Sequence, residues 1–118
     1  PVIAADLAFQ CLVGYKKQFS ARHMTITYDV TDEFERNSPA VVHVDKTVRP
    51  QVVFEEDNPF LLALLKAWYA ETGGLCLVNT SFNLHEDPIV SSTDDIVYTF
   101  LKGAVDYLLF PPYIAECK

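Results

Sequence analysis

The chain has 118 residues, of which 50% are hydrophobic, 13% aromatic and 21% charged, and its formal net charge is −7 at pH 7. This length and composition fit one globular domain, or part of one, and exclude an intrinsically disordered chain. The acidic balance argues against a nucleic-acid-binding surface, which is usually basic, but it permits an anionic small ligand wherever a few cations gather.

Cysteine usage and hydropathy indicate a soluble, cytoplasmic protein. Cys11, Cys76 and Cys117 are odd in number and have no CxxC spacing, which favours a reducing compartment over a disulfide framework or a zinc site. No apolar run is long enough to span a membrane, and the first one lacks the pattern of a secretion signal. The chain begins with Pro1 and its one methionine is Met24, which is consistent with a fragment.

The first half of the chain predicts a helix, a strand, a loop and an extended segment, in that order. Residues 2–19 have crowded apolar residues and a polar end, which favours a helix. Residues 24–30 alternate as a half-buried strand does, and residues 31–39 read as a polar, acidic loop. Residues 39–54 are rich in β-branched side chains and contain Pro50, so an extended conformation is expected.

The clearest helical pattern follows. Asp57 or Asn58 can cap it, Pro59 suits its first turn, and Gly73-Gly74 ends it. Its apolar residues are spaced by three, four and seven, with one more that widens the stripe, so we expect burial on more than one side.

The rest of the chain predicts a short buried strand over residues 75–78, a helix over residues 91–103 and a final strand over residues 105–110. Ser92 and Asp95 have the spacing of a capping box at the start of that helix. Strands that alternate with helices favour an α/β fold, here a mixed twisted sheet with packed helices.

The extended segment has a row of polar residues at alternate positions. Two readings of this row remain open: a ligand surface for phosphate or carboxylate, centred on the guanidinium, or the solvent face of an antiparallel sheet. The residues of the row are His43, Asp45, Thr47, Arg49 and Gln51.

A polar cluster, NTSFN at residues 79–83, follows the predicted strand at residues 75–78. In α/β folds ligands bind beyond the carboxyl ends of strands, and hydroxyls and amides there can contact phosphate or carbonyl oxygens. The same residue types also favour plain turns, so both interpretations stand at this point.

Other groups carry weaker signals. His43 and Asp45 could act as a base and its orienting partner, although a surface pair has the same spacing. His85, Glu86 and Asp87 are adjacent and cannot easily converge on one metal ion, so we expect a solvated loop and no metal site. Cys76 is expected to lie in the core.

Three stretches follow one another along the chain: VVHVDKTVRPQVV, NPFLLALLKAWYAETGGLCLVNTSFN and DPIVSSTDDIVYTFLKGAVDYLLF. Taken in this order, they resemble the C-terminal domain of the O-carbamoyltransferase family, which includes nodulation-factor and antibiotic-tailoring carbamoyltransferases. The family pattern has a histidine-valine-aspartate block that ends in arginine-proline-glutamine, then asparagine-threonine-serine-phenylalanine-asparagine. The match covers roughly residues 24–114.

The resemblance implies a partial YrdC/Sua5-like fold and a two-step biosynthetic reaction. ATP and carbamoyl phosphate would form a carbamoyl adenylate, with Mg²⁺ on the nucleotide, and a Kae1-like N-terminal domain or subunit would pass the carbamoyl group to a hydroxyl of a sugar or natural product. Ser81-Phe82-Asn83 matches the Ser-x-Asn half of a YrdC-like site. The resemblance thus assigns binding of the nucleotide and carbamoyl adenylate to Arg49, Asn79, Thr80, Ser81 and Asn83, with His43, Asp45 and Glu86 in support.

Departures from the family pattern qualify this assignment. Lys46 and Val48 replace a glycine and an alanine, and the Lys-x-Arg pair of a YrdC-like site is missing upstream. We therefore expect part of an O-carbamoyltransferase that is incomplete as an isolated catalyst, with an N-terminal helical segment at residues 1–23 and the carbamoyltransferase C-terminal-like domain at residues 24–118. The alternative is a non-catalytic remnant that serves as an interaction module or subunit.

Overall fold

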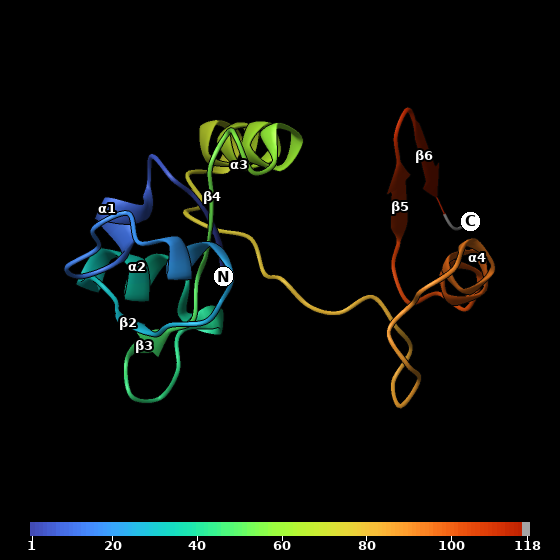
Figure 1. Cartoon of the computed structure of the whole chain (residues 1–118), viewed down its shortest axis with the longest axis horizontal. Helices are drawn as coiled ribbons and strands as arrows, with labels where there is room; N and C mark the ends of the chain where they lie inside the picture. Colours follow the sequence, from blue (N-terminus) through green and yellow to red (C-terminus); the bar gives the residue numbers. More distant parts are fainter. Residues whose placement is uncertain (117–118) are drawn as a thin grey trace. The chain divides into compact units, whose positions relative to one another are not determined.

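The computed structural model describes residues 1–116, which form two compact units, Pro1–Asn79 and a second unit that begins at Thr80 (Figure 1). Helices and small sheets occur together, so the expected mixed α/β class is confirmed. Within the described residues the strands pair as three two-stranded sheets rather than as one mixed sheet. The strands are only two to four residues long, which leaves little backbone for a larger sheet.

The centre of the first unit is a parallel pair of strands, β1 (Val2–Ala4) and β4 (Gln51–Val53), which are buried on both faces. Ile3 belongs to the larger apolar cluster, whereas Val2 belongs to a second cluster with residues of the long helix. A strand with two buried faces shows no polar alternation. The predicted helix over residues 2–19 is therefore wrong, because the apolar run encodes a buried strand followed by a single helical turn, α1 (Ala8–Cys11).

An antiparallel pair, β2 (Tyr28–Asp29) and β3 (Thr47–Val48), closes the other side of the larger cluster. Of the strand predicted over residues 24–30, only β2 forms, and Met24 has a positive φ of 55°. The extended segment predicted over residues 39–54 is also interrupted. It begins with a 3₁₀ turn, η2 (Pro39–Val41), and then turns sharply before β3, where Lys46 has a φ of 64°.

Two further helical turns contribute to the same cluster, η1 (Phe19–Arg22) and α2 (Asp32–Asn37). The loop predicted over residues 31–39 is wrong, because α2 occupies most of it. The Thr31 hydroxyl accepts a hydrogen bond from Phe34 N over 3.2 Å, and the Phe34 side chain is fully buried. One cap and one apolar anchor are enough to fold this short acidic segment as a helix.

The long helix α3 (Pro59–Thr72) confirms the clearest prediction from the sequence. Asn58 Oδ1 caps it by accepting from Leu61 N over 3.0 Å, and Gly73 ends it with a φ of 71°. Burial on more than one side is wrong, however: only Leu62 and Leu65 are buried. The helix exposes Phe60, Leu64, Trp68 and Tyr69.

The segment after α3 returns to the central strands. Leu75 is buried in the larger cluster, and Leu77 forms one antiparallel bridge with Val2. The strand predicted over residues 75–78 is thus reduced to a single bridge, although that bridge places Leu77 beside β1, on which β4 also pairs.

The second unit contains α4 (Thr93–Leu101) and a hairpin of β5 (Tyr107–Phe110) and β6 (Tyr113–Glu116). The helix and its capping box are confirmed: Asp95 N donates to Ser92 Oγ, and Ser92 N donates to Asp95 Oδ2, each over 3.1 Å. The strand predicted over residues 105–110 is confirmed as β5, but it is not the final one, because β6 follows Pro111-Pro112. None of the helices within residues 1–116 combines the length and apolarity needed to cross a bilayer.

Candidate functional site

A cavity of about 260 Å³ in the first unit brings together three residues that the sequence singles out, His43, Arg49 and Asn79. Arg49 lies in the short link between β3 and β4, where the neighbouring residues Val48 and Pro50 are fully buried. Buried neighbours fix the backbone of this link while the arginine side chain stays exposed. The other lining residues are Pro1, Met24, Ala40, Val41, Val42 and Val78.

The guanidinium of Arg49 gives this cavity a permanent positive charge. None of the salt bridges found among residues 1–116 includes Arg49. By contrast, Arg22 bonds Asp57 over 2.9 Å and Glu56 over 3.0 Å. A planar guanidinium that is not committed to a carboxylate can accept a phosphate or carboxylate in a bidentate geometry.

The central strands bring Asn79 beside the Arg49 segment. Val2 pairs with Gln51 on one side and with Leu77 on the other, so the two residues beyond Leu77 reach the end of β1 that lies next to Arg49 and Gln51. There Asn79 Nδ2 donates to Gln51 Oε1 over 2.7 Å and approaches Met24 Sδ at 3.9 Å. Asn79 thus follows a single β-bridge rather than the predicted strand, and its ligand role stays a prediction.

No hydrogen bond between His43 and Asp45 is found in the described part of the chain, but Thr47 bonds to both. The Thr47 hydroxyl and backbone N–H both donate to Asp45 Oδ1, over 2.7 Å and 3.0 Å, and His43 Nδ1 lies 3.1 Å from the same hydroxyl. Since the hydroxyl has one proton and gives it to Asp45, His43 Nδ1–H must be the donor to Thr47. The Nε2 atom of the neutral imidazole is then an acceptor.

Hydrogen bonds from Thr47 also favour the ionised form of the Asp45 carboxyl. The side-chain hydrogen bond from Thr47, and then its backbone hydrogen bond, hold the pKa of Asp45 below its usual value, with a smaller contribution from His43. A carboxylate that stays ionised and accepts the Thr47 hydroxyl keeps that hydroxyl in an orientation that receives His43.

The row of alternate polar residues predicted over 43–51 does not exist as one strand face. His43 and Asp45 lie in the turn before β3, which hydrogen bonds between His43 and Thr47 (2.9 Å) and between Lys46 and His43 (2.9 Å) close. The turn nevertheless brings His43 and Arg49 to one cavity. Thr47 and Gln51 belong to the predicted polar row, but their actual hydrogen-bond partners could not be predicted, because they depend on the turn and on Asn79, which lies 28 residues away from Gln51.

The rest of the predicted cluster belongs to the second unit. Thr80 and Ser81 line a cavity of about 210 Å³ whose other walls are mostly apolar, namely Phe82, Val105, Tyr107 and Leu108. Asn83 Nδ2 donates to Leu84 O over 2.7 Å and to Asp87 O over 3.2 Å, so its amide N–H groups close the local loop. The ligand roles of Thr80, Ser81 and Asn83 stay predictions.

The loop at residues 84–88 has a turn of its own. Asp87 N donates to Leu84 O over 3.1 Å, and Glu86 is exposed with a φ of 69°. Within residues 1–116 no three or more His, Cys, Asp or Glu residues gather in an arrangement that could hold a metal ion. A supporting role for Glu86 stays a prediction.

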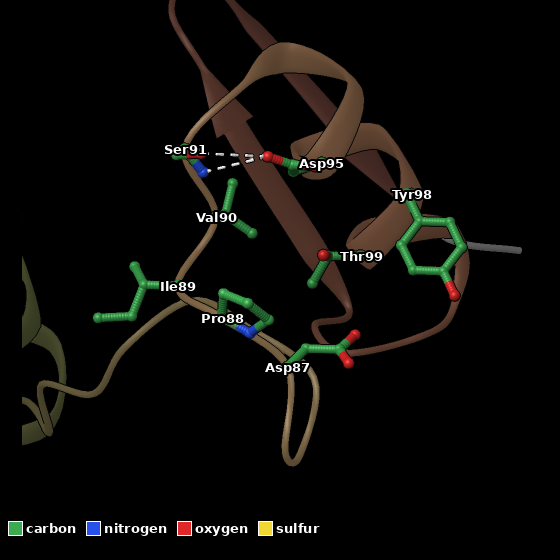
Figure 2. A pocket seen from close by; sticks show the side chains of 8 residues that line it. All are labelled: Asp87, Pro88, Ile89, Val90, Ser91, Asp95, Tyr98 and Thr99. Carbon is green, nitrogen blue, oxygen red and sulfur yellow. Dashed lines mark hydrogen bonds between the residues drawn. The ribbon is translucent and has the colours of Figure 1, made fainter.

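A cavity of about 390 Å³ in the second unit has no counterpart in the sequence analysis (Figure 2). It is lined by residues 87–91 and by Asp95, Tyr98 and Thr99 of α4. The Asp95 carboxylate accepts from Ser91 and Ser92, and those hydrogen bonds hold its pKa below the usual value. Since this carboxylate caps α4, its hydrogen bonds have a structural explanation.

The chain belongs to the family described as "Carbamoyltransferase C-terminus", whose model matches residues 1–116. The family that the sequence motifs suggested is thus confirmed. This places the chain among proteins whose family name refers to carbamoyl transfer.

Proteins from several organisms are similar in sequence to this chain. An uncharacterized protein of Methanocaldococcus jannaschii is 36% identical over 104 residues, which are 88% of this chain and 17% of that protein. The nodulation protein NolO of Bradyrhizobium diazoefficiens is 39% identical over 65% of this chain. A 3'-hydroxymethylcephem-O-carbamoyltransferase of Amycolatopsis lactamdurans is 35% identical over 59% of it. The chain spans 14% of the length of each of these last two proteins.

Proposed function

We propose that this chain forms part of the site at which an O-carbamoyltransferase makes carbamoyl adenylate from ATP and carbamoyl phosphate. The cavity beside Arg49 carries the proposal, because an arginine without a salt bridge among the described residues lines it together with His43 and Asn79. Membership of the carbamoyltransferase family supports it. In the same proposal the fold is part of a YrdC/Sua5-like fold.

The residue types suit the chemistry. Water would first cleave carbamoyl phosphate into carbamate and inorganic phosphate. A carbamate oxygen would then bond to the α-phosphorus of ATP as the bond from that phosphorus to pyrophosphate breaks. Negative charge moves between phosphates during these steps, and fixed cations and hydrogen-bond donors stabilise it. Arg49 would hold a phosphate, and His43, oriented through Thr47, would present Nε2 as an acceptor for a proton.

For the second unit we propose binding roles for Thr80, Ser81 and Asn83, with Glu86 in support. The hydroxyls of Thr80 and Ser81 line an apolar cavity, and such a surface suits a nucleoside better than a free phosphate. Asn83 would act mainly by holding its loop, since its N–H groups already bond two carbonyl oxygens.

Mg²⁺ would accompany ATP. This ion prefers oxygen ligands and is often bound through substrate phosphates and water. The described residues offer no cluster of three or more ligands, so we assign no metal ligand to the chain and route no step through the ion.

The acceptor half of the reaction requires a partner. We propose a Kae1-like domain or subunit that transfers the carbamoyl group to a hydroxyl of a sugar or natural product. The exposed apolar residues of α3, among them Phe60, Leu64 and Trp68, suit such a contact, because large apolar side chains gathered on one helix usually pack against something. A cytoplasmic location fits ATP as co-substrate and the free thiols of Cys11 and Cys76.

Calorimetry tests the binding function. The wild-type chain should bind ATP and carbamoyl phosphate. Arg49→Ala should weaken the binding of carbamoyl phosphate by about ten- to hundredfold, because a charge-assisted hydrogen bond contributes roughly 1.5–3 kcal/mol. Ser81→Ala should weaken ATP binding instead. Arg36→Ala is the matched control, since Arg36 is an exposed arginine of α2 away from the cavity lining.

Two results would count against this function. If the wild type binds neither ligand, the chain has no such site. If Arg49→Ala and Arg36→Ala bind carbamoyl phosphate equally well, the cavity beside Arg49 is not the place where the phosphate binds.

The exposed residues of α3 also favour a second candidate, an interaction module or subunit without catalysis. Size-exclusion chromatography with nucleotide titration separates the two. A monomer that binds ATP supports the first function, whereas a tight oligomer that does not respond to nucleotide, and that Trp68→Ala dissociates, supports the second.

A further inference from the structure

The cavity of about 210 Å³ that Thr80 and Ser81 line combines an apolar wall with an exposed aromatic ring. Phe82, Val105 and Leu108 of the wall are half-buried, whereas Tyr107 is 60% exposed. Because apolar carbon offers water no hydrogen bond, it is favourable to cover this wall with an apolar group. Cavities for whole drug-sized ligands measure about 300–1,000 Å³, so this one has room for a single ring system rather than for an entire nucleotide.

Contacts outside the cavity hold its two aromatic residues in place. Tyr107 pairs with Glu116 across the β5–β6 hairpin (Figure 1), and its hydroxyl donates to Glu116 Oε1 over 3.3 Å. Val90 N donates to Phe82 O over 3.0 Å, which fixes the backbone that carries the second ring. Rings that are held before a ligand arrives lose little conformational entropy when it binds. The cavity thus presents preorganised aromatic surface to a flat ligand.

The polar groups at the cavity recognise a ring without reading its substituents. Thr80 and Ser81 contribute hydroxyls, each of which can donate one hydrogen bond or accept two. Among the described residues that line the cavity, none has a charged or amide side chain. Adenine and guanine differ in a fixed pattern of donors and acceptors, and a hydroxyl that turns from donor to acceptor does not separate them. Stacking accepts every base, because each base has a π-face.

We propose that Phe82 and Tyr107 hold the base of the nucleotide by stacking, and that the site therefore accepts purine nucleoside triphosphates as a class, GTP as well as ATP. This inference rests on the proposed function, which brings a nucleotide to the second unit. It adds the residues that bind the base and the breadth of the substrate class. Purines bind more tightly than pyrimidines, because their larger ring systems cover more of the apolar wall.

Calorimetry with the full chain compares ATP, GTP, CTP and inorganic tripolyphosphate, all at one concentration of Mg²⁺. ATP and GTP should bind with affinities within about threefold of each other, since stacking tolerates both bases. CTP should bind more weakly than either purine nucleotide. Tripolyphosphate has no base, and it should bind about five- to 150-fold more weakly than ATP, because one stacked base is worth roughly 1–3 kcal/mol.

Variants assign this preference to the two rings. Tyr107→Leu and Phe82→Leu each remove a ring but keep an apolar side chain, so each should weaken ATP and GTP at least about fivefold and leave tripolyphosphate and carbamoyl phosphate within about twofold. Tyr107→Phe keeps the ring and should retain the affinity for ATP. Tyr113→Leu is the matched control, since Tyr113 is an exposed tyrosine of β6 that does not line the cavity. The amide NMR spectrum of each variant checks its folding.

The aromatic side-chain proton resonances separate stacking from a structural role. Those of Phe82 and Tyr107 should shift with ATP and with GTP, and stay in place with tripolyphosphate. Equal binding of ATP and tripolyphosphate, or full ATP affinity in both leucine variants, overturns the inference while carbamoyl phosphate binding at Arg49 stands. A preference for ATP over GTP above about thirtyfold means that the base edges are read, and it overturns the proposed class. Absence of both ATP and carbamoyl phosphate binding overturns the inference and the proposed function together.

Discussion

Thr47 holds Asp45 through two hydrogen bonds to a single carboxylate oxygen, one from its hydroxyl over 2.7 Å and one from its backbone N–H over 3.0 Å. The hydroxyl is also 3.1 Å from His43 Nδ1. The turn before β3 thus fixes the histidine at the edge of the Arg49 cavity by means of a threonine. The pKa of Asp45 is therefore sensitive to the hydrogen bonds from Thr47.

Thr47→Val should raise the pKa of Asp45 toward its ordinary value, but not all the way, because the backbone hydrogen bond remains. A carboxyl whose pKa is depressed in the folded state stabilises the fold above its unfolded pKa, and that contribution is lost as the pH falls through the folded pKa. The stability advantage of the wild type over the variant should therefore shrink below about pH 4.

Carbon-detected NMR titration of the Asp45 carboxyl measures the shift, and long-range ¹⁵N spectra show whether His43 loses its Nδ1–H tautomer in the variant. Thr27→Val is the control, since Thr27 is exposed and lies just before β2. An unchanged pKa of Asp45 in Thr47→Val would contradict the arrangement.

The second prediction concerns the acidic helix α2. Phe34→Ala should destabilise the first unit by about 3–5 kcal/mol, the usual cost of removing a fully buried phenylalanine ring. Phe60→Ala should cost far less, because the Phe60 side chain is 53% exposed on α3. Urea unfolding of both variants checks the difference. Similar losses from both would mean that α2 does not anchor the core through Phe34.

The third prediction concerns the capping box of α4. Ser92→Ala removes the acceptor of Asp95 N and should destabilise the second unit by about 1 kcal/mol. It should also raise the pKa of Asp95, whose largest perturbation is the hydrogen bond from Ser92. Ser92→Thr keeps a capping hydroxyl and should retain most of the stability. Hydrogen exchange of the α4 amides measures the effect, and equal exchange in all three proteins would contradict it.

The features that could be predicted from the sequence are those whose causes are local. Asn58, Gly73 and the Ser92–Asp95 box define their helix ends through residues within four positions, and α3 and α4 lie where these signals place them. The residue types at the Arg49 cavity are also visible in the sequence, and His43, Arg49 and Asn79 do meet there.

The features that were missed depend on distant partners. Residues 2–4 show no polar alternation, because α3 packs on one face of β1 and the larger cluster on the other. Neither partner is visible within residues 2–19, so the apolar run predicts a helix. The exposure of Phe60 and Trp68 cannot be derived from the spacing of α3, which says which residues share a face but not what covers it. The pairing of Asn79 with Gln51 requires Val2 to lie between Gln51 of β4 and Leu77.

The last prediction concerns Cys11, whose side chain is fully buried in the larger cluster. Burial raises the pKa of this thiol to about 12, and Cys76 and Glu33 nearby act in the same direction. Because the unfolded thiol ionises near pH 9 and the folded one does not, the fold should lose stability as the pH rises from about 9 toward 12. Cys11→Ala should remove this part of the pH dependence.

In the native wild type at pH 8, iodoacetamide should leave Cys11 unmodified and label it only in denaturant, since the thiolate is the reacting species. Mass spectrometry detects the label. Rapid labelling of Cys11 under native conditions would mean that the cluster opens readily around α1, and it would contradict the placement of this residue in the core.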